Sequence, residues 1–302
     1  MTVYIGELPI SKDLVLSSRF YTKLMELGIS AITLPVGSID EAWIEILRSC
    51  RAIKQIGNGI IATHEVFELD SCTPNIDRYV KALGLIERVG LEPIALIPSF
   101  LDLASCVVHE EFRLIESPNK ASIFIHFMKN VIKEFGRIGI EKIVVRDKTL
   151  HEIFGDGRPL YGYTRDFVSE AYDYLAYGVK EFVVYTPSPS IYSVEILVEI
   201  TEPKAIGIRF LQPEAVHAIL TDFIVEKVKQ QDKKILAGIV SPIALCEEAV
   251  TRRIYMELLS IMPRTKIIKV IDGMDLMHYC SDPKYCISRI IEAARVLNLL
   301  EM

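Results

Sequence analysis

A charged triplet, Arg146-Asp147-Lys148, directly follows the apolar run Ile143–Val145. Charges at the end of a buried run must be paired or must face water, because an isolated charge is too costly to bury. Asp147 is the candidate acid or base for catalysis, and Arg146 and Lys148 are candidate ligands for an anionic substrate. An ordinary ion pair between neighbouring strands is the alternative explanation.

Polar residues also end several other apolar runs. Arg209 follows Ala205–Ile208 and is expected either to bind an anion or to pair with Asp147. Asp272 and Asp275 flank Gly273, an arrangement that also suits a plain turn, and for these two residues the turn is the favoured explanation. The remaining candidate ligand-binding residues are Glu7, His64, Glu65 and Tyr185.

The sequence offers one local set of metal-binding residue types, His278, Cys280, Asp282 and Cys286. The spacing of its cysteines is not one that zinc sites use, and Cys286 falls on a helix face that should be buried. We therefore expect no metal. The six cysteines include no Cys-x-x-Cys pair, so most are expected to be buried free thiols.

Two kinds of segment alternate along the chain and must position these residues. Short, continuously apolar runs are typical of strands covered on both faces, as in a parallel sheet. We expect such strands at 3–5, 31–36, 59–66, 92–97, 142–146, 181–186, 204–210, 234–240 and 266–271. Amphipathic segments predict helices at 14–27, 39–56, 76–89, 123–138, 167–177, 244–261 and 286–299.

This alternation predicts a single (β/α)₈ barrel domain over residues 1–302, with one of the nine strand-like runs outside the barrel. A doubly wound dinucleotide fold is excluded because no Gly-x-Gly-x-x-Gly turn occurs. In a (β/α)₈ barrel the active site lies at the carboxyl ends of the strands. The polar residues that follow the runs should therefore gather there.

Composition excludes several partners. The net charge is −6 and basic residues are scattered, so nucleic acid is not expected to bind. No apolar stretch is long enough to span a membrane, and the first residues do not resemble a signal peptide, so we expect a cytoplasmic protein. Only four Gln and five Asn occur among 302 residues, which is typical of thermophile proteins.

The order of the strand-end motifs resembles the C-terminal barrel of cobalamin-independent methionine synthase, in the wider group that includes uroporphyrinogen decarboxylase. Residues 2–9 (TVYIGELP) resemble the opening T-x-x-I-G-S-F-P of that family, and residues 143–150 (IVVRDKTL) stand where it has I-Q-I-D-E-P-A-L. Residues 238–242 (GIVSP) resemble its late G-V-Y-D-I-H-S-P segment, and 270–276 (VIDGMDL) its V-N-P-D-C-G-L. The resemblance implies a (β/α)₈ fold with an extra early strand.

The resemblance also implies a zinc ion, held by His-x-Cys, Glu and Cys, that activates the thiol of homocysteine. The matching places here are Tyr185-Thr186-Pro187, then Arg209, then Gly273-Met274. These residues do not form a zinc ligand set. Of the acidic pair that would hold the amino group of the substrate, Arg146 replaces one member and only Asp147 is acidic.

The resemblance therefore implies a methionine-synthase-like barrel without zinc. Its expected role is to bind a reduced pterin or folate methyl donor as an accessory component of methionine biosynthesis. The expected partners are a zinc-bearing methionine-synthase catalytic barrel or a second copy of the chain, with no other cofactor. One alternative is an active enzyme with non-zinc chemistry, either a methyltransferase or decarboxylase-like, that uses Asp147 as acid or base and Arg146 or Arg209 as anion binder. Another is a structural subunit in which these charges pair only with each other.

Overall fold

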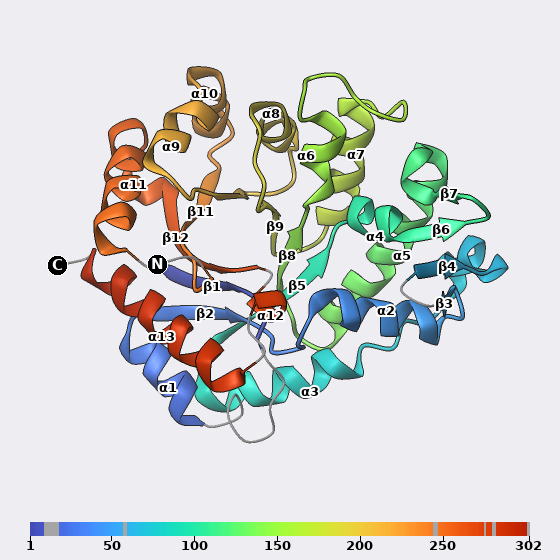
Figure 1. The fold of residues 1–302 in the computed structure, drawn as a ribbon, viewed down its shortest axis with the longest axis horizontal. Helices are drawn as coiled ribbons and strands as arrows, with labels where there is room; N and C mark the ends of the chain where they lie inside the picture. The colour runs from blue at the N-terminus through green and yellow to red at the C-terminus, as the bar shows by residue number, and fades with distance from the viewer. Residues whose placement is uncertain (9–17, 57–58, 244–246, 275, 280–281, 301–302) are drawn as a thin grey trace.

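A computed structural model describes residues 1–8, 18–56, 59–243, 247–274, 276–279 and 282–300. Eight parallel strands form a closed barrel (Figure 1). The strands, in their order around the barrel, are β1 (Thr2–Gly6), β12 (Ile267–Gly273), β11 (Lys234–Val240), β10 (Ala205–Arg209), β9 (Glu181–Thr186), β8 (Lys142–Arg146), β5 (Glu92–Pro98) and β2 (Ile29–Thr33). The predicted (β/α)₈ barrel is confirmed.

Helices connect the strands and cover the barrel, burying its apolar outer face as the amphipathic patterns require. They are α1 (Ser18–Glu26), α2 (Ile39–Ser49), α3 (Asp77–Ile86), α4 (Phe100–Cys106), α5 (Pro118–Arg137), α6 (Thr149–Phe154), α7 (Arg165–Ala176), α8 (Ile191–Glu199), α9 (Pro213–Ile219), α10 (Asp222–Gln230), α11 (Glu248–Ile261), α12 (Leu276–Tyr279) and α13 (Pro283–Leu299). Short 3₁₀ helices are η1 (His64–Ser71), η2 (Glu87–Val89), η3 (Leu114–Glu116) and η4 (Arg264–Lys266). None of the described helices is long and apolar enough to cross a membrane.

A second, four-stranded sheet lies at one edge of the molecule, on the right in Figure 1. Its order is β3 (Ile53–Ile56), β4 (Gly59–Ala62), β6 (Val107–His109) and β7 (Phe112–Arg113). Residues 59–62 of the predicted strand at 59–66 form β4 of this sheet, so the ninth run does lie outside the barrel, but the prediction is wrong for residues 64–66, which belong to η1. The predicted helix at 39–56 is wrong in its second half, because α2 ends at Ser49 and residues 53–56 pair antiparallel with β4.

The pairing between neighbouring strands shows which side chains lie at the same level inside the barrel. At the carboxyl end, Arg146 is level with Tyr185, and Ile5 is level with Asp272. At the amino end, Lys142 is level with Glu181. Apolar residues such as Val144 and Val183 fill the layer between them. The barrel therefore has polar groups at both ends and an apolar middle.

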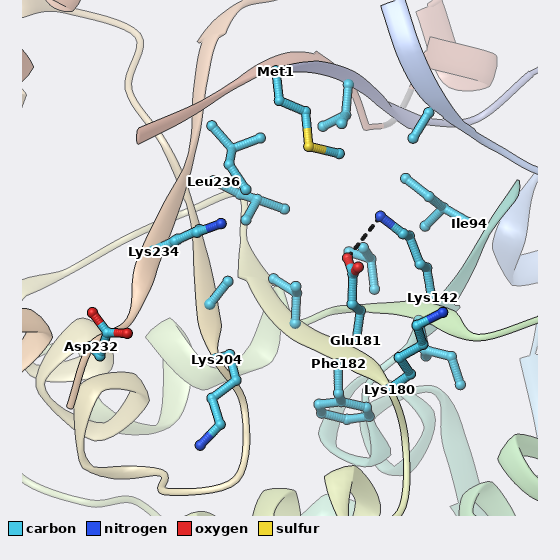
Figure 2. A pocket seen from close by; sticks show the side chains of 17 residues that line it. Met1, Ile94, Lys142, Lys180, Glu181, Phe182, Lys204, Asp232, Lys234 and Leu236 are labelled. Atoms are coloured by element: carbon cyan, nitrogen blue, oxygen red, sulfur yellow. Dashed lines mark ion pairs between the residues drawn. The ribbon is translucent and has the colours of Figure 1, made fainter. Parts of the chain in front are cut away.

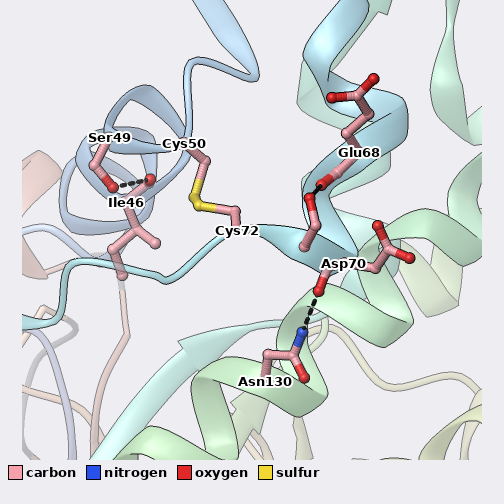
Figure 3. Close-up of a disulfide and its surroundings, with 8 residues drawn as sticks. Ile46, Ser49, Cys50, Glu68, Asp70, Cys72 and Asn130 are labelled. Carbon is pink, nitrogen blue, oxygen red and sulfur yellow. Dashed lines mark hydrogen bonds between the residues drawn. A yellow bond between two sulfur atoms is a disulfide. The ribbon is translucent and has the colours of Figure 1, made fainter.

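A disulfide joins Cys50, at the end of α2, to Cys72, which follows η1 (Figure 3). The expectation of mostly buried free thiols is therefore wrong for these two cysteines and for Cys286, which is also disulfide-bonded, and the free Cys106 is exposed. Among intracellular proteins, structural disulfides are characteristic mainly of hyperthermophiles.

Candidate functional site at the carboxyl end of the barrel

Arg146 is the central charged residue of the barrel mouth. Its side chain is only 2% exposed, and its guanidinium pairs with Asp40 in the first turn of α2 and with Asp102 in the first turn of α4. Burial alone would lower the pKa of Arg146, but the charges of Asp102 and Asp40 raise it above its usual value. Arg146 is therefore a permanent cation held between two carboxylates.

Asp102 is also part of the wall of the barrel mouth. Its Oδ1 accepts hydrogen bonds from Lys148 N at 3.0 Å, Thr149 N at 3.1 Å and Thr149 Oγ1 at 2.8 Å, so it caps the start of α6. Its Oδ2 lies 3.5 Å from Arg146 Nε. Burial raises the pKa of Asp102, although the positive charge of Arg146 opposes this effect.

A pocket of about 230 Å³ lies beside this pair of residues, between α2, α4 and the edge of the small sheet. We call it the Arg146 pocket. Its polar walls include Asp40, Asp102, Arg146 and Lys148, and its apolar walls include Trp43, Ile44, Leu47, Ile60, Leu103 and Val107. The thiol-bearing Cys106 also lines it. Within the described part of the chain, Asp102 Oδ2 and Arg146 Nη1 have no hydrogen-bond partner.

Asp147 lies at the same end of the barrel but does not line this pocket. It is fully buried, its Oδ1 accepts from Leu150 N at 2.8 Å, and its Oδ2 accepts from the hydroxyl of Tyr172 on α7. Burial and the nearby charge of Asp102 raise the pKa of Asp147 to about 7. The pKa would suit an acid or base, but the geometry is that of a helix cap buried under α7.

Tyr185, Arg209 and Asp272 form a second polar cluster in the mouth. Asp272 accepts two hydrogen bonds from Arg209, at 2.6 Å from Nε and 2.9 Å from Nη2, and a third from the hydroxyl of Tyr185. Met274 N also donates to Asp272 Oδ1 at 2.9 Å. Arg209 was expected to bind an anion or to pair with Asp147, and in the structure it pairs with Asp272.

Two glycines make room for this cluster inside the barrel. A Cβ atom on Gly238 would lie 2.0 Å from the hydroxyl oxygen of Tyr185, and one on Gly207 would lie 2.2 Å from its ring. No residue other than glycine fits at these positions while Tyr185 reaches across to Asp272. The large tyrosine and the two glycines on neighbouring strands therefore form one packing unit.

The other predicted site residues have different surroundings. Glu7 is buried, and its carboxylate accepts a hydrogen bond from Ile39 N at 3.1 Å. Lys148 lines the Arg146 pocket. His64 and Glu65 are exposed in η1, outside the barrel, so they are not at a barrel strand end as expected. Asp275 and Cys280 lie outside the described residues.

Four residues of the Arg146 pocket, Asp40, Trp43, Asp102 and Cys106, were not predicted from the sequence. A usable signal was present for the two acids, because a buried arginine at a strand end needs carboxylates nearby. Acidic residues in the first turns of the helices that follow neighbouring strands are the obvious candidates, and Asp40 and Asp102 are such residues. Nothing in the pattern distinguishes Trp43 and Cys106 from ordinary core residues.

The residues that the motif resemblance places at the zinc-ligand positions of methionine synthase do not form a metal-binding set in this structure. Arg209 is a cation, and the hydroxyl of Tyr185 is hydrogen-bonded to Asp272. Met274 offers only a weakly donating thioether. Over the described ranges, no group of three or more His, Cys, Asp or Glu residues is close enough to hold a metal.

Comparison with known proteins shows the fold. No protein-family model matches the chain, and no curated protein matches it. A B12-independent methionine synthase from Shewanella sp. W3-18-1, solved in complex with selenomethionine, superposes with a TM-score of 0.65 at 10% identity, covering 100% of this chain and 99% of that chain. A candidate vitamin-B12-independent methionine synthase from Listeria monocytogenes gives 0.63 at 13% identity, over 98% and 96% of the two chains.

Other barrels are also similar. A methyltransferase from Methanosarcina mazei gives a TM-score of 0.58 at 10% identity, over 92% of this chain and 83% of that chain. A Bacteroidetes-affiliated cellulase gives 0.53 at 11% identity, over 97% and 91% of the chains. The class that fold and neighbours define is the (β/α)₈ barrel. Methionine-synthase-like and methyltransferase barrels are among its structural neighbours, beside a glycoside hydrolase.

Proposed function

We propose that this barrel binds a reduced-pterin methyl donor in the Arg146 pocket and acts as an accessory component of methyl transfer. The observation that carries the proposal is that, among the described residues, Asp102 Oδ2 and Arg146 Nη1 have no hydrogen-bond partner, although Asp102 Oδ2 remains in an ion pair with Arg146 Nε at 3.5 Å. Buried polar atoms without partners are uncommon in folded proteins, and a ligand is one explanation for them.

A pterin ring carries hydrogen-bonding groups that complement this wall. Its pyrimidinone edge presents a carbonyl acceptor next to N–H donors, which fits a guanidinium donor beside a carboxylate acceptor. The bicyclic ring is flat and largely apolar on its faces, like the Trp43, Ile44 and Leu47 side of the pocket. A pocket of about 230 Å³ is large enough for the ring system but leaves a longer tail outside.

Binding requires one local change. Asp102 Oδ2 and Arg146 Nη1 are closed off from solvent, and the hydrogen bond from Arg146 Nη2 to Asp40 helps to hold the guanidinium in place. The Asp40 side chain is 39% exposed, so water can solvate it when it turns outward, but the buried guanidinium of Arg146 then needs a replacement partner. We propose that the ligand replaces Asp40 as a partner of Arg146.

In the proposed role, the barrel binds the methyl donor but does not activate the thiol of homocysteine. Homocysteine at neutral pH is mostly the protonated thiol, which is a poor nucleophile, and the positions that would hold an activating zinc ion carry Tyr185, Arg209 and Met274. The barrel would therefore work with a zinc-bearing catalytic barrel, or as a self-associated assembly that binds the donor. The resemblance between the sequence motifs and the methionine synthase family supports this partner.

The alternative of an active enzyme with Asp147 as acid or base has less support. Both carboxylate oxygens of Asp147 are hydrogen-bonded inside the protein, and the residue is fully buried. A catalytic acid must come within hydrogen-bonding distance of the substrate. Access would require α6 and α7 to separate from β8.

Titration calorimetry with 5-methyltetrahydrofolate and with a reduced pterin that lacks the glutamate tail tests the proposal. We expect saturable binding of both compounds, and a loss of at least tenfold in affinity for Arg146→Met, since a charged hydrogen bond contributes about 1.5–3 kcal/mol. Arg78→Gln is the control, because Arg78 is also paired with a carboxylate, that of Glu45, but is more exposed than Arg146 and does not line the Arg146 pocket. No binding by the wild-type chain, or equal binding by Arg146→Met, would refute the proposal.

A further inference from the structure

A second cavity, of about 390 Å³, lies at the opposite end of the barrel from the Arg146 pocket. Its inner wall consists of apolar side chains from the amino-terminal halves of the strands: Val3, Ala31, Ile94, Val144, Val183, Ala205, Leu236 and Ile268. Its rim carries lysines and acids, and Met1 lies at its upper edge in Figure 2. The volume falls within the range of about 300–1,000 Å³ typical of small-molecule sites.

Some of the charges on this rim neutralise each other. Lys142 pairs with Glu92 and with Glu181, each at 2.8 Å. Lys180 pairs with Glu141, at 2.5 Å. These pairs leave that side of the rim without an excess of positive charge.

The opposite side of the rim differs in charge. Lys204 and Lys234 lie side by side, since Lys234 N donates to the carbonyl of Lys204 at 2.9 Å. Across the residues described, no carboxylate is within ion-pairing distance of either side chain, and the nearby Asp232 is already paired with Lys266. The hydrogen bond and charge of Lys266, with smaller contributions from Lys234 and Lys204, lower the pKa of Asp232. Three lysines, Lys204, Lys234 and Lys266, therefore lie near one carboxylate, that of Asp232, which pairs only with Lys266 among them.

Figure 2 shows that the Lys234 side chain extends toward the centre of the cavity, next to Leu236. An apolar interior beside an unpaired cation is complementary to a molecule with an aliphatic chain and an anionic head. We propose that this end of the barrel binds a medium-chain aliphatic carboxylate, with its chain against the apolar wall and its carboxylate at Lys234 and Lys204.

Calorimetry with octanoate, octan-1-ol and butyrate separates the contributions of head and chain. We expect one octanoate to bind per chain, and octanol and butyrate to bind at least tenfold more weakly. Raising the ionic strength should weaken octanoate binding, because the lysines are exposed and screened by salt. Equal affinity for octanol and octanoate, or no octanoate binding, would overturn the proposal.

Variants then locate the site. Lys204→Gln/Lys234→Gln should weaken octanoate binding at least tenfold. Lys180→Gln is the matched control, since it removes a lysine of the same rim that is paired with Glu141, and it should change the affinity by less than twofold. Unchanged binding by the double variant would overturn the proposal. The comparison of ligands on the wild-type chain remains decisive if a variant fails to fold.

Discussion

At the scale of single residues, Asp147 shows how burial and hydrogen bonding act against each other on one carboxyl group. Burial raises its pKa to about 7, while hydrogen bonds from Tyr172 and Leu150 N favour the charged form. In an unfolded chain the same group has a pKa near 4. Between these values the folded state holds a proton that the unfolded state has released.

Asp147 therefore makes a defined contribution to the pH dependence of stability. Its contribution is fully present below about pH 4 and is lost as the pH rises toward 7, by at most about 1.4 kcal/mol per pH unit. Asn at this position keeps an acceptor for Leu150 N but does not titrate. In urea titrations at pH 5 and pH 8, we expect the wild type to lose more unfolding free energy between the two values than Asp147→Asn. An equal loss in both proteins would contradict this account of Asp147.

The glycine at position 238 gives a second prediction at this scale. Ala at 238 would place its Cβ 2.0 Å from the hydroxyl oxygen of Tyr185, so the tyrosine must move away from Asp272. We expect Gly238→Ala to lower the unfolding free energy by about 1–3 kcal/mol, as overpacking usually does. Gly84→Ala is the control, because that helical glycine has nothing within 4 Å of an added Cβ and should become more stable by about 0.5–1 kcal/mol. A neutral Gly238→Ala would show that Tyr185 is not held there.

The residue types at the strand ends predicted part of this site. Arg146, Tyr185, Arg209 and Asp272 do gather at one end of the barrel, because parallel strands bring their carboxyl ends together. Their partners could not be assigned from the pattern. Whether Arg209 pairs with Asp147 or with Asp272 depends on which face of each strand a side chain occupies, and that is set by the registers between strands.

At the scale of elements, the small sheet is the feature that periodicity did not predict. Residues 53–56 continue the apolar spacing of α2 yet form a strand, because they pair with β4. Short apolar segments fit helix and strand patterns equally well, and only long-range pairing decides between them. This sheet matters for the proposed function, since Ile60 and Val107 form one wall of the Arg146 pocket.

The disulfide covalently links the end of α2 to the residue that follows η1. Cys50 and Cys72 are 22 positions apart and enclose β3 and β4. A bond closing a loop of that size contributes about 3 kcal/mol through the unfolded state. We expect Cys72→Ser to lower the melting temperature, whereas Cys106→Ser, which removes an exposed free thiol, should leave it nearly unchanged. Equal melting temperatures for wild type and Cys72→Ser would contradict a structural role for this bond.

At the scale of the whole molecule, the sequence pattern predicted the barrel because eight buried runs and the helices between them all agree with one fold. The two ends of this barrel have different chemistry. The carboxyl end has two charged clusters, of which the one around Arg146 lines the Arg146 pocket, and the amino end has an apolar cavity with a lysine rim. Superposition on methionine synthase barrels at 10–13% identity supports the fold alone.

The absence of a resident zinc ion is a prediction for the molecule as a whole. The residues at the expected ligand positions include the cation Arg209 and the thioether of Met274. We expect elemental analysis of the protein, freed of any affinity tag, to find far less than one zinc per chain. About one zinc per chain, lost on substitution of Cys280 and Cys286, would instead support the local set near the C-terminus and a thiol methyltransferase.

The most direct test of the central claim uses Cys106 as a reporter of the Arg146 pocket, because its thiol is exposed and lines that pocket. Alkylation by iodoacetamide, followed by peptide mass spectrometry, gives the reaction rate at this residue alone. We expect 5-methyltetrahydrofolate, at a concentration that just saturates the wild type, to slow alkylation of Cys106 at least fivefold in the wild type and much less in Arg146→Met. Unchanged alkylation of wild-type Cys106 by the ligand would contradict the claim that the donor binds in this pocket.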